Sequence, residues 1–172
     1  MKTTVRFTTI FALTLASGLA LTHVAAQMPQ PSAADVQKLQ RFVGTWNGKG
    51  EMKASDFGPA GTMTWTETCE WFEGKHHVIC HSTGKGPTGE VKGLSIMGFD
   101  PAAKAYTFYG VDNQGWSDFS TGTLSGKTWT FTSRNNSRFS LTEVSDTKHT
   151  FNWEIAPDGK TWTTIMTGEA SK

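Results

Sequence analysis

The stretch that decides the fold is residues 63–71, Met-Thr-Trp-Thr-Glu-Thr-Cys-Glu-Trp, in which large and polar side chains alternate. Successive side chains of a β-strand point to opposite faces, so Trp65, Cys69 and Trp71 share one face and the threonines share the other. A strand with one apolar and one polar face separates an interior from solvent. Glu67 departs from this pattern, because its position puts a carboxyl group on the apolar face.

The same alternation continues along the rest of the chain. Trp129 and Phe131 alternate with threonines, and Phe151 and Trp153 alternate with polar residues. Turn sequences containing Gly, Asp, Asn and Pro separate ten such segments, and these links are too short for crossover helices. The predicted strands are 44–54, 60–72, 76–84, 89–99, 104–112, 116–125, 127–134, 137–145, 148–156 and 160–169. We therefore predict an all-β fold, an antiparallel up-and-down barrel of about ten strands, because closure removes exposed strand edges.

The N-terminal part of the chain predicts a targeting segment. Residues 1–26 carry Lys2 and Arg6, then an apolar stretch, then a small-residue end, which is typical of a secretory signal peptide. We expect an exported protein, periplasmic or secreted, from a bacterium. Residues 27–34 contain two prolines and are expected to form a flexible leader.

One short helix is expected before the first strand. Apolar residues in 35–43 recur at helical spacing, and Ser32 or Asp35 would cap the helix. The barrel domain is thus predicted to span 35–172.

Composition excludes several classes of protein. The chain has 16 basic and 15 acidic residues, and removal of residues 1–26 would leave 14 and 15 over 146 residues. Without a basic cluster we expect no nucleic-acid partner. No later apolar segment is long enough for a membrane span, and seven Trp with eleven Phe indicate a folded core. Nothing in the sequence sets the oligomeric state.

Several motifs resemble known families. Residues 42–50, Phe-Val-Gly-Thr-Trp-Asn-Gly-Lys-Gly, resemble the opening of calycin-type barrels such as lipocalins and fatty-acid-binding proteins. There the resemblance implies that Trp46 plugs the barrel bottom. Together with this start, residues 71–74, 97–100, 122–129 and 158–162 resemble the secreted bacterial family labelled domain of unknown function 1579. That resemblance implies a fold and no established activity. The opening is also similar to that of nitrobindins, ten-stranded barrels that hold haem through a histidine, for which the candidate here is His149.

Cys69 and Cys80 are expected to face each other. A tight hairpin with Gly74 and Lys75 at its centre pairs residue 69 with residue 80, at a Cα separation that allows a disulfide. Export would place the pair in an oxidising compartment. The alternative is two reduced thiols buried in the barrel.

A metal site at the histidines is not expected. His77 and His81 share a strand face but lie about 13 Å apart at roughly 3.3 Å per residue, while Zn–N bonds are about 2 Å. His76 points to the opposite face. We therefore predict no metal site.

The inward residues predict a ligand-binding interior. A ten-stranded barrel is wider than the eight-stranded barrel that side chains just fill, so a closed barrel should leave a cavity. The predicted lining residues are Trp65, Glu67, Trp71, Phe131, His149, Phe151 and Trp153. Large aromatic side chains favour a small apolar or amphipathic ligand.

Other functions stay open at this stage. Glu67 or His149 would serve an enzyme acting in the cavity, haem binding would use His149, and a filled barrel would be an interaction module. We expect no cofactor, except haem in the haem-binding alternative. The simpler interpretation of Glu67 is a residue at a strand end whose side chain reaches water. The simpler interpretation of His149 is a residue at the rim of the barrel.

Overall fold

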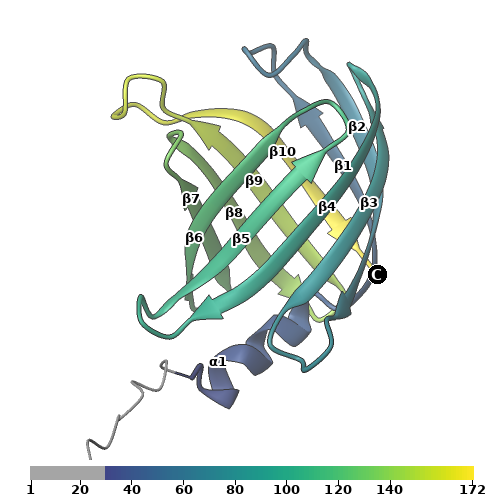
Figure 1. Cartoon of the computed structure of the whole chain (residues 1–172). Helices are drawn as coiled ribbons and strands as arrows, with labels where there is room; N and C mark the ends of the chain where they lie inside the picture. Colours follow the sequence, from purple (N-terminus) through teal and green to yellow (C-terminus); the bar gives the residue numbers. More distant parts are fainter. Residues whose placement is uncertain (1–29) are drawn as a thin grey trace, which may run out of the picture.

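The computed structural model describes residues 30–172 and contains ten strands that follow one another along the chain (Figure 1). The predicted signal peptide and residues 27–29 of the predicted leader lie outside the described residues. The strands are β1 (Gly44–Met52), β2 (Gly61–Trp71), β3 (Val78–Gly86), β4 (Gly89–Asp100), β5 (Ala105–Asp112), β6 (Ser117–Ser125), β7 (Thr128–Ser133), β8 (Ser137–Ser145), β9 (Lys148–Ile155) and β10 (Thr163–Ser171).

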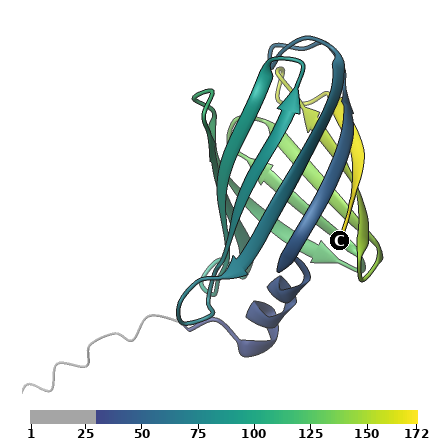
Figure 2. The same ribbon diagram turned by 90° about the vertical axis from the view of Figure 1, so that its right-hand side faces the viewer.

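All ten strands form one closed antiparallel barrel, which confirms the predicted fold. Each strand pairs with its neighbour in sequence, and β1 closes the barrel by pairing with β10, with Asn47 opposite Ser171. Figure 2 shows the strands running obliquely around the barrel axis. Closure pairs every strand on both sides and directs the alternate faces of all strands to one shared interior.

The predicted helix forms as α1 (Ala33–Lys38), followed by a single 3₁₀ turn, Leu39–Arg41. Ser32 is its N-cap, because the Ser32 hydroxyl accepts a hydrogen bond from the Asp35 backbone N–H at 3.1 Å. This cap starts the helix at Ala33, so residues 33 and 34 belong to the helix rather than to the leader. The helix lies beneath one end of the barrel in both views (Figures 1 and 2).

A hydrophobic cluster fills the barrel at this end. Leu39 and Phe42 of the helical segment pack into it, and Trp129 lies at its centre with ring contacts to Phe42 and Tyr106. The buried members of the cluster are Leu39, Phe42, Cys69, Val78, Cys80, Met97, Tyr106, Trp129, Phe131 and Leu141. The barrel therefore has a filled, helix-covered end, and space remains only further along its axis.

The hairpin between β2 and β3 has the predicted register. Cys69 lies opposite Cys80, and a disulfide joins the two sulfurs. The loop between the strands is longer than the predicted two-residue turn, because the last hydrogen bond of the ladder joins the Phe72 N–H to the His77 carbonyl and leaves residues 73–76 in the loop. The disulfide ties the filled end of β2 to that of β3.

The last strand contains an irregularity that simple alternation does not allow. The pairing of β10 with β9 shifts between Thr164 and Met166, and both Ile165 and Met166 are buried. A β-bulge of this kind resets which face the following residues occupy. Trp162 precedes β10 and lies under the Arg138 guanidinium at 4.2 Å from the ring centre.

In residues 30–172, no helix is both long enough and apolar enough to cross a membrane.

We predict that the disulfide contributes about 3 kcal/mol to the free energy of unfolding, because linking two cysteines 11 residues apart lowers the conformational entropy of the unfolded chain. The measurement is urea unfolding of the oxidised protein and of the C69A/C80A variant. The variant should unfold at lower urea with a similar slope. Equal midpoints for the two proteins would contradict the prediction.

Candidate functional site

The barrel encloses a cavity of about 300 Å³ above the filled end. Most of the aromatic residues predicted to face the interior lie on its wall, together with both predicted titratable residues. The predicted residues that line it are Trp65, Glu67, Phe131, His149, Phe151 and Trp153. Small-molecule pockets range upward from roughly 300 Å³, so this volume suits a small ligand of about one to three rings.

Trp71 is the predicted residue that the structure does not bring to the cavity. It shares the inward face of β2 but lies at the end of that strand, where its indole N–H donates to the Gln40 side chain at 2.7 Å. It packs against the hydrophobic cluster. Alternation gives the side of a strand on which a residue lies, but not its height along the barrel.

One wall of the cavity is aromatic. The Phe151 ring contacts both Trp65, at 5.4 Å between ring centres, and Phe139, at 5.6 Å. Glycine makes this arrangement possible, because a Cβ on Gly48 would lie 2.2 Å from atoms of the Trp65 ring. Gly48 thus leaves space for the indole, and Gly50 leaves space for the Phe151 ring, whose nearest atom would lie 2.9 Å from a Cβ there. Trp153, further from the filled end, is held by an indole hydrogen bond to Ser137 at 2.7 Å.

The wall contributed by β3, β4 and β6 carries small polar residues. Ser82, Ser95 and Ser120 all line the cavity, and Ser120 donates to the Asp118 carboxylate at 2.9 Å. Asp118 also lines the cavity, close to the start of β6 and therefore to the end of the barrel away from α1. These four residues were not predicted from the sequence. Ser82 could have been predicted, because the expected pairing of residue 69 with residue 80 also places residue 82 opposite Glu67.

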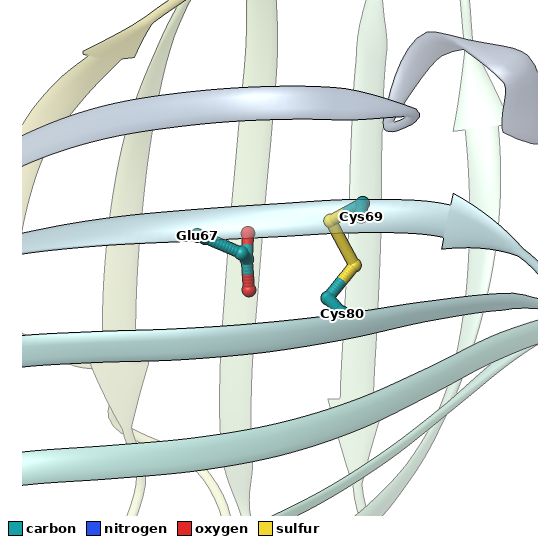
Figure 3. A group of neighbouring side chains, drawn as sticks. All are labelled: Glu67, Cys69 and Cys80. Carbon is teal, nitrogen blue, oxygen red and sulfur yellow. A yellow bond between two sulfur atoms is a disulfide. The ribbon is translucent and has the colours of Figure 1, made fainter.

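Glu67 faces the interior, as the alternation predicts, and does not reach water at a strand end. Trp46 and Ser82 lie opposite it on β1 and β3, and its carboxylate lies beside the Cys69–Cys80 disulfide (Figure 3). The side chain is half-buried, since part of its surface opens on the cavity. Removal from bulk water raises the pKa of the Glu67 carboxyl from 4.5 to about 7.

His149 lies deep in the cavity and is only 7% exposed, so it is not a rim residue. Its ring packs on Trp46, with 4.5 Å between ring centres, and its Nδ1 is buried without a hydrogen-bond partner. Burial, followed by the positive charges of Arg41 and Lys172, lowers the pKa of His149 from 6.5 to about 4. The imidazole is therefore neutral at physiological pH.

Trp46 forms the support beneath His149. It is 2% exposed, and its indole N–H donates to the Phe42 carbonyl at 2.8 Å. The Arg41 guanidinium lies 4.9 Å and the Lys172 ammonium 4.5 Å from the Trp46 ring centre, both within range of a cation–π contact. Neither cation lines the cavity.

Two arrangements have donor atoms suited to a metal or cofactor. Ligand atoms of Glu67, Cys69 and Cys80 lie within 4.8 Å of one another, but the two sulfurs are bonded to each other and are not thiolates. The neutral imidazole of His149 is the form that would ligate haem iron, but its unpartnered Nδ1 is itself buried.

The chain belongs to the family described as protein of unknown function (DUF1579), whose match covers residues 31–172. The family resemblance inferred from the motifs is thereby confirmed. A search of curated proteins gives no match to the chain.

Solved structures with a similar fold include Rv2717c from M. tuberculosis, at 11% identity and a TM-score of 0.62, covering 83% of this chain and 99% of that one. Another is the S-type phycobiliprotein lyase CPES from Guillardia theta, at 7% identity and a TM-score of 0.45, covering 82% and 96%. At these identities the likeness concerns the fold alone.

Glu67 and His149 predict opposite dependences of stability on pH. A raised carboxyl pKa favours the folded state below pH 4.5, and this contribution is lost as the pH rises to about 7. A lowered histidine pKa has the reverse effect, since stability is lost as the pH falls from 6.5 to about 4. Each effect amounts to as much as about 3 kcal/mol. Because the two effects have opposite signs over nearly the same pH range, together they change the stability of the native protein little as the pH varies.

Single variants should separate the two effects. Relative to the native protein, Glu67→Gln should gain stability as the pH rises from 5 to 8, and His149→Gln should gain it as the pH falls from 7 to 4. The measurement is urea unfolding at each pH. A stability difference from the native protein that does not change with pH would contradict the assignment for that residue.

Proposed function

We propose that this protein binds a small apolar or amphipathic molecule inside its barrel. The observation that carries the proposal is a cavity of about 300 Å³ inside the barrel, lined mainly by aromatic and other apolar side chains together with a few small polar residues. Apolar surface provides affinity in such sites, and a few polar groups fix orientation.

The proposal places the binding protein outside the cytoplasm. Support comes from the signal-peptide pattern of residues 1–26 and from the disulfide between β2 and β3, since disulfides persist in oxidising compartments. Fractionation of the native host tests this point: the protein should be found in the periplasm or medium, shortened at its N-terminus. Recovery of the full-length chain in the cytoplasm would contradict it.

Filling the cavity tests the binding proposal. Ser82→Leu puts a bulky side chain into the cavity, while Thr83→Leu puts the same side chain on the exposed outer face of β3. With the neutral fluorescent probe N-phenyl-1-naphthylamine, we expect binding to the native protein and to Thr83→Leu. Affinity for Ser82→Leu should fall by about tenfold or more, because the added volume competes with the ligand.

Two results would contradict the binding proposal. Equal binding by both leucine variants would place the probe on the surface, and no binding to any of the three proteins would remove the proposal. Thermal unfolding of the variants serves as the control for folding.

Haemin belongs in the same screen: a Soret band lost in His149→Ala would support the haem alternative, and an absent band would reject it.

A catalytic role in the cavity is the second candidate. It is favoured by the pKa of about 7 at Glu67, because general acid–base groups work best with a pKa near the working pH. If a screen detects turnover, Glu67→Gln should abolish it while N-phenyl-1-naphthylamine still binds. Turnover that survives both Glu67→Gln and His149→Gln would remove this candidate.

A further inference from the structure

The charge on the cavity wall has only one sign. Its titratable lining residues are Glu67, Asp118 and His149, and no lysine or arginine lines it within residues 30–172. His149 is neutral near pH 7, since its pKa is lowered to about 4. Any net charge on this wall at neutral pH is therefore negative, and an anionic ligand would meet repulsion with no counter-ion supplied by the wall.

Glu67 is the lining carboxylate without a partner. Other acidic side chains at partly buried positions are satisfied: Asp118 accepts from Ser120 at 2.9 Å, and Glu154 pairs with Arg138 at 2.8 Å. In the described part of the chain, by contrast, no hydrogen bond or ion pair reaches the Glu67 carboxylate, and desolvation alone sets its pKa. A charged group withdrawn from water without a partner is costly, and a ligand that supplies the partner recovers that cost.

A second unpartnered polar group lies in the same cavity. His149 is more than nine-tenths buried, and its Nδ1 makes no hydrogen bond. Glu67 and His149 both approach Trp46, Glu67 as its cross-strand partner and His149 through ring packing at 4.5 Å. The deep end of the cavity thus carries a carboxyl group and a neutral imidazole, each beside Trp46.

The surrounding aromatic rings suit a positive charge. Trp65 lies two residues before Glu67 on the same face of β2, and its ring packs against Phe151 at 5.4 Å. Aromatic faces attract cations, more strongly when water is excluded. Within this barrel Trp46 already contacts two cations, Arg41 and Lys172.

We propose that the ligand is an organic cation, an amine with a flat apolar body of one or two rings, whose nitrogen lies against Glu67. This inference rests on the proposed function and names the ligand class. The aromatic wall of Trp65, Phe139 and Phe151 takes the apolar body, and the deep carboxylate takes the ammonium group. Carboxylate ligands such as fatty acids are disfavoured, since the wall carries no cation to receive them.

Binding of a cation should expel a proton. Near pH 7 about half of the Glu67 carboxyls are protonated, and an ammonium group against Glu67 favours the carboxylate form. The proton lost by Glu67 passes to the buffer. Trp46 and Ser82 flank Glu67 from β1 and β3, and the other titratable groups on the wall are Asp118 and His149. None of these supplies a competing positive charge at neutral pH.

A matched set of ligands tests the proposal by isothermal titration calorimetry at pH 7.5. The three probes share one two-ring body and differ in charge: 2-naphthylmethylamine as the cation, 2-naphthylmethanol as the neutral ligand and 2-naphthoate as the anion. We expect the amine to bind about tenfold or more tightly than the alcohol, with the naphthoate weakest. Glu67→Gln should bring the amine to the level of the alcohol and leave the alcohol within about twofold.

The matched control is Glu70→Gln, which removes a carboxylate from the exposed outer face of the same strand and should leave all three affinities unchanged. At pH 6.5 the measured heat of amine binding should vary with the ionisation enthalpy of the buffer, as proton release requires. The heat of alcohol binding should not vary. This second readout does not depend on a variant.

The outcomes separate the two proposals. If the alcohol or the naphthoate binds as tightly as the amine, the cation inference is wrong and the binding function stands. The same holds if Glu67→Gln and Glu70→Gln weaken the amine equally. If none of the three probes binds and N-phenyl-1-naphthylamine also fails, both the inference and the proposed function are wrong.

Discussion

Pairing of β1 with β10 is the constraint on which the rest of the structure depends. Once that edge closes, every inward side chain faces one shared space. The circumference of ten strands is then too large for those side chains to fill the space completely. The filled end, with Leu39, Phe42 and Trp129, uses the large residues available near α1. Further along the axis, small residues, glycines packed against the aromatic rings and serines on β3, β4 and β6, leave the cavity unfilled.

The position of Glu67 connects the fold to its chemistry. Strand alternation forces this side chain inward, and the neighbouring strands place Trp46 and Ser82 beside it rather than a cation. Its carboxyl group is therefore desolvated without compensation inside the protein. A carboxyl group that lowers stability when ionised, in a cavity of ligand size, is more readily explained by binding than by folding. His149, held neutral and packed on Trp46, adds a second polar group at the same depth.

Much of this arrangement could be predicted from local sequence, and the failures have identifiable physical reasons. Two-residue periodicity placed Glu67 and Trp65 on the inward face, and the turn at Gly74 set the register that pairs Cys69 with Cys80. Periodicity carries no information about position along the barrel axis. Trp71 was therefore predicted to line the cavity, although it lies at the filled end of the barrel. The bulge in β10 breaks the alternation at Ile165, and only pairing with β9 reveals the new register. Asp118 and Ser120 reach the cavity through closure, which joins residues far apart in the chain.

A crystal structure of the protein soaked with 2-naphthylmethylamine tests the central claim most directly. The account predicts electron density for the two rings inside the barrel against Trp65 and Phe151, with the nitrogen about 2.8 Å from a Glu67 oxygen. Density on the outer surface alone, or an interior that side chains have closed completely, would contradict it.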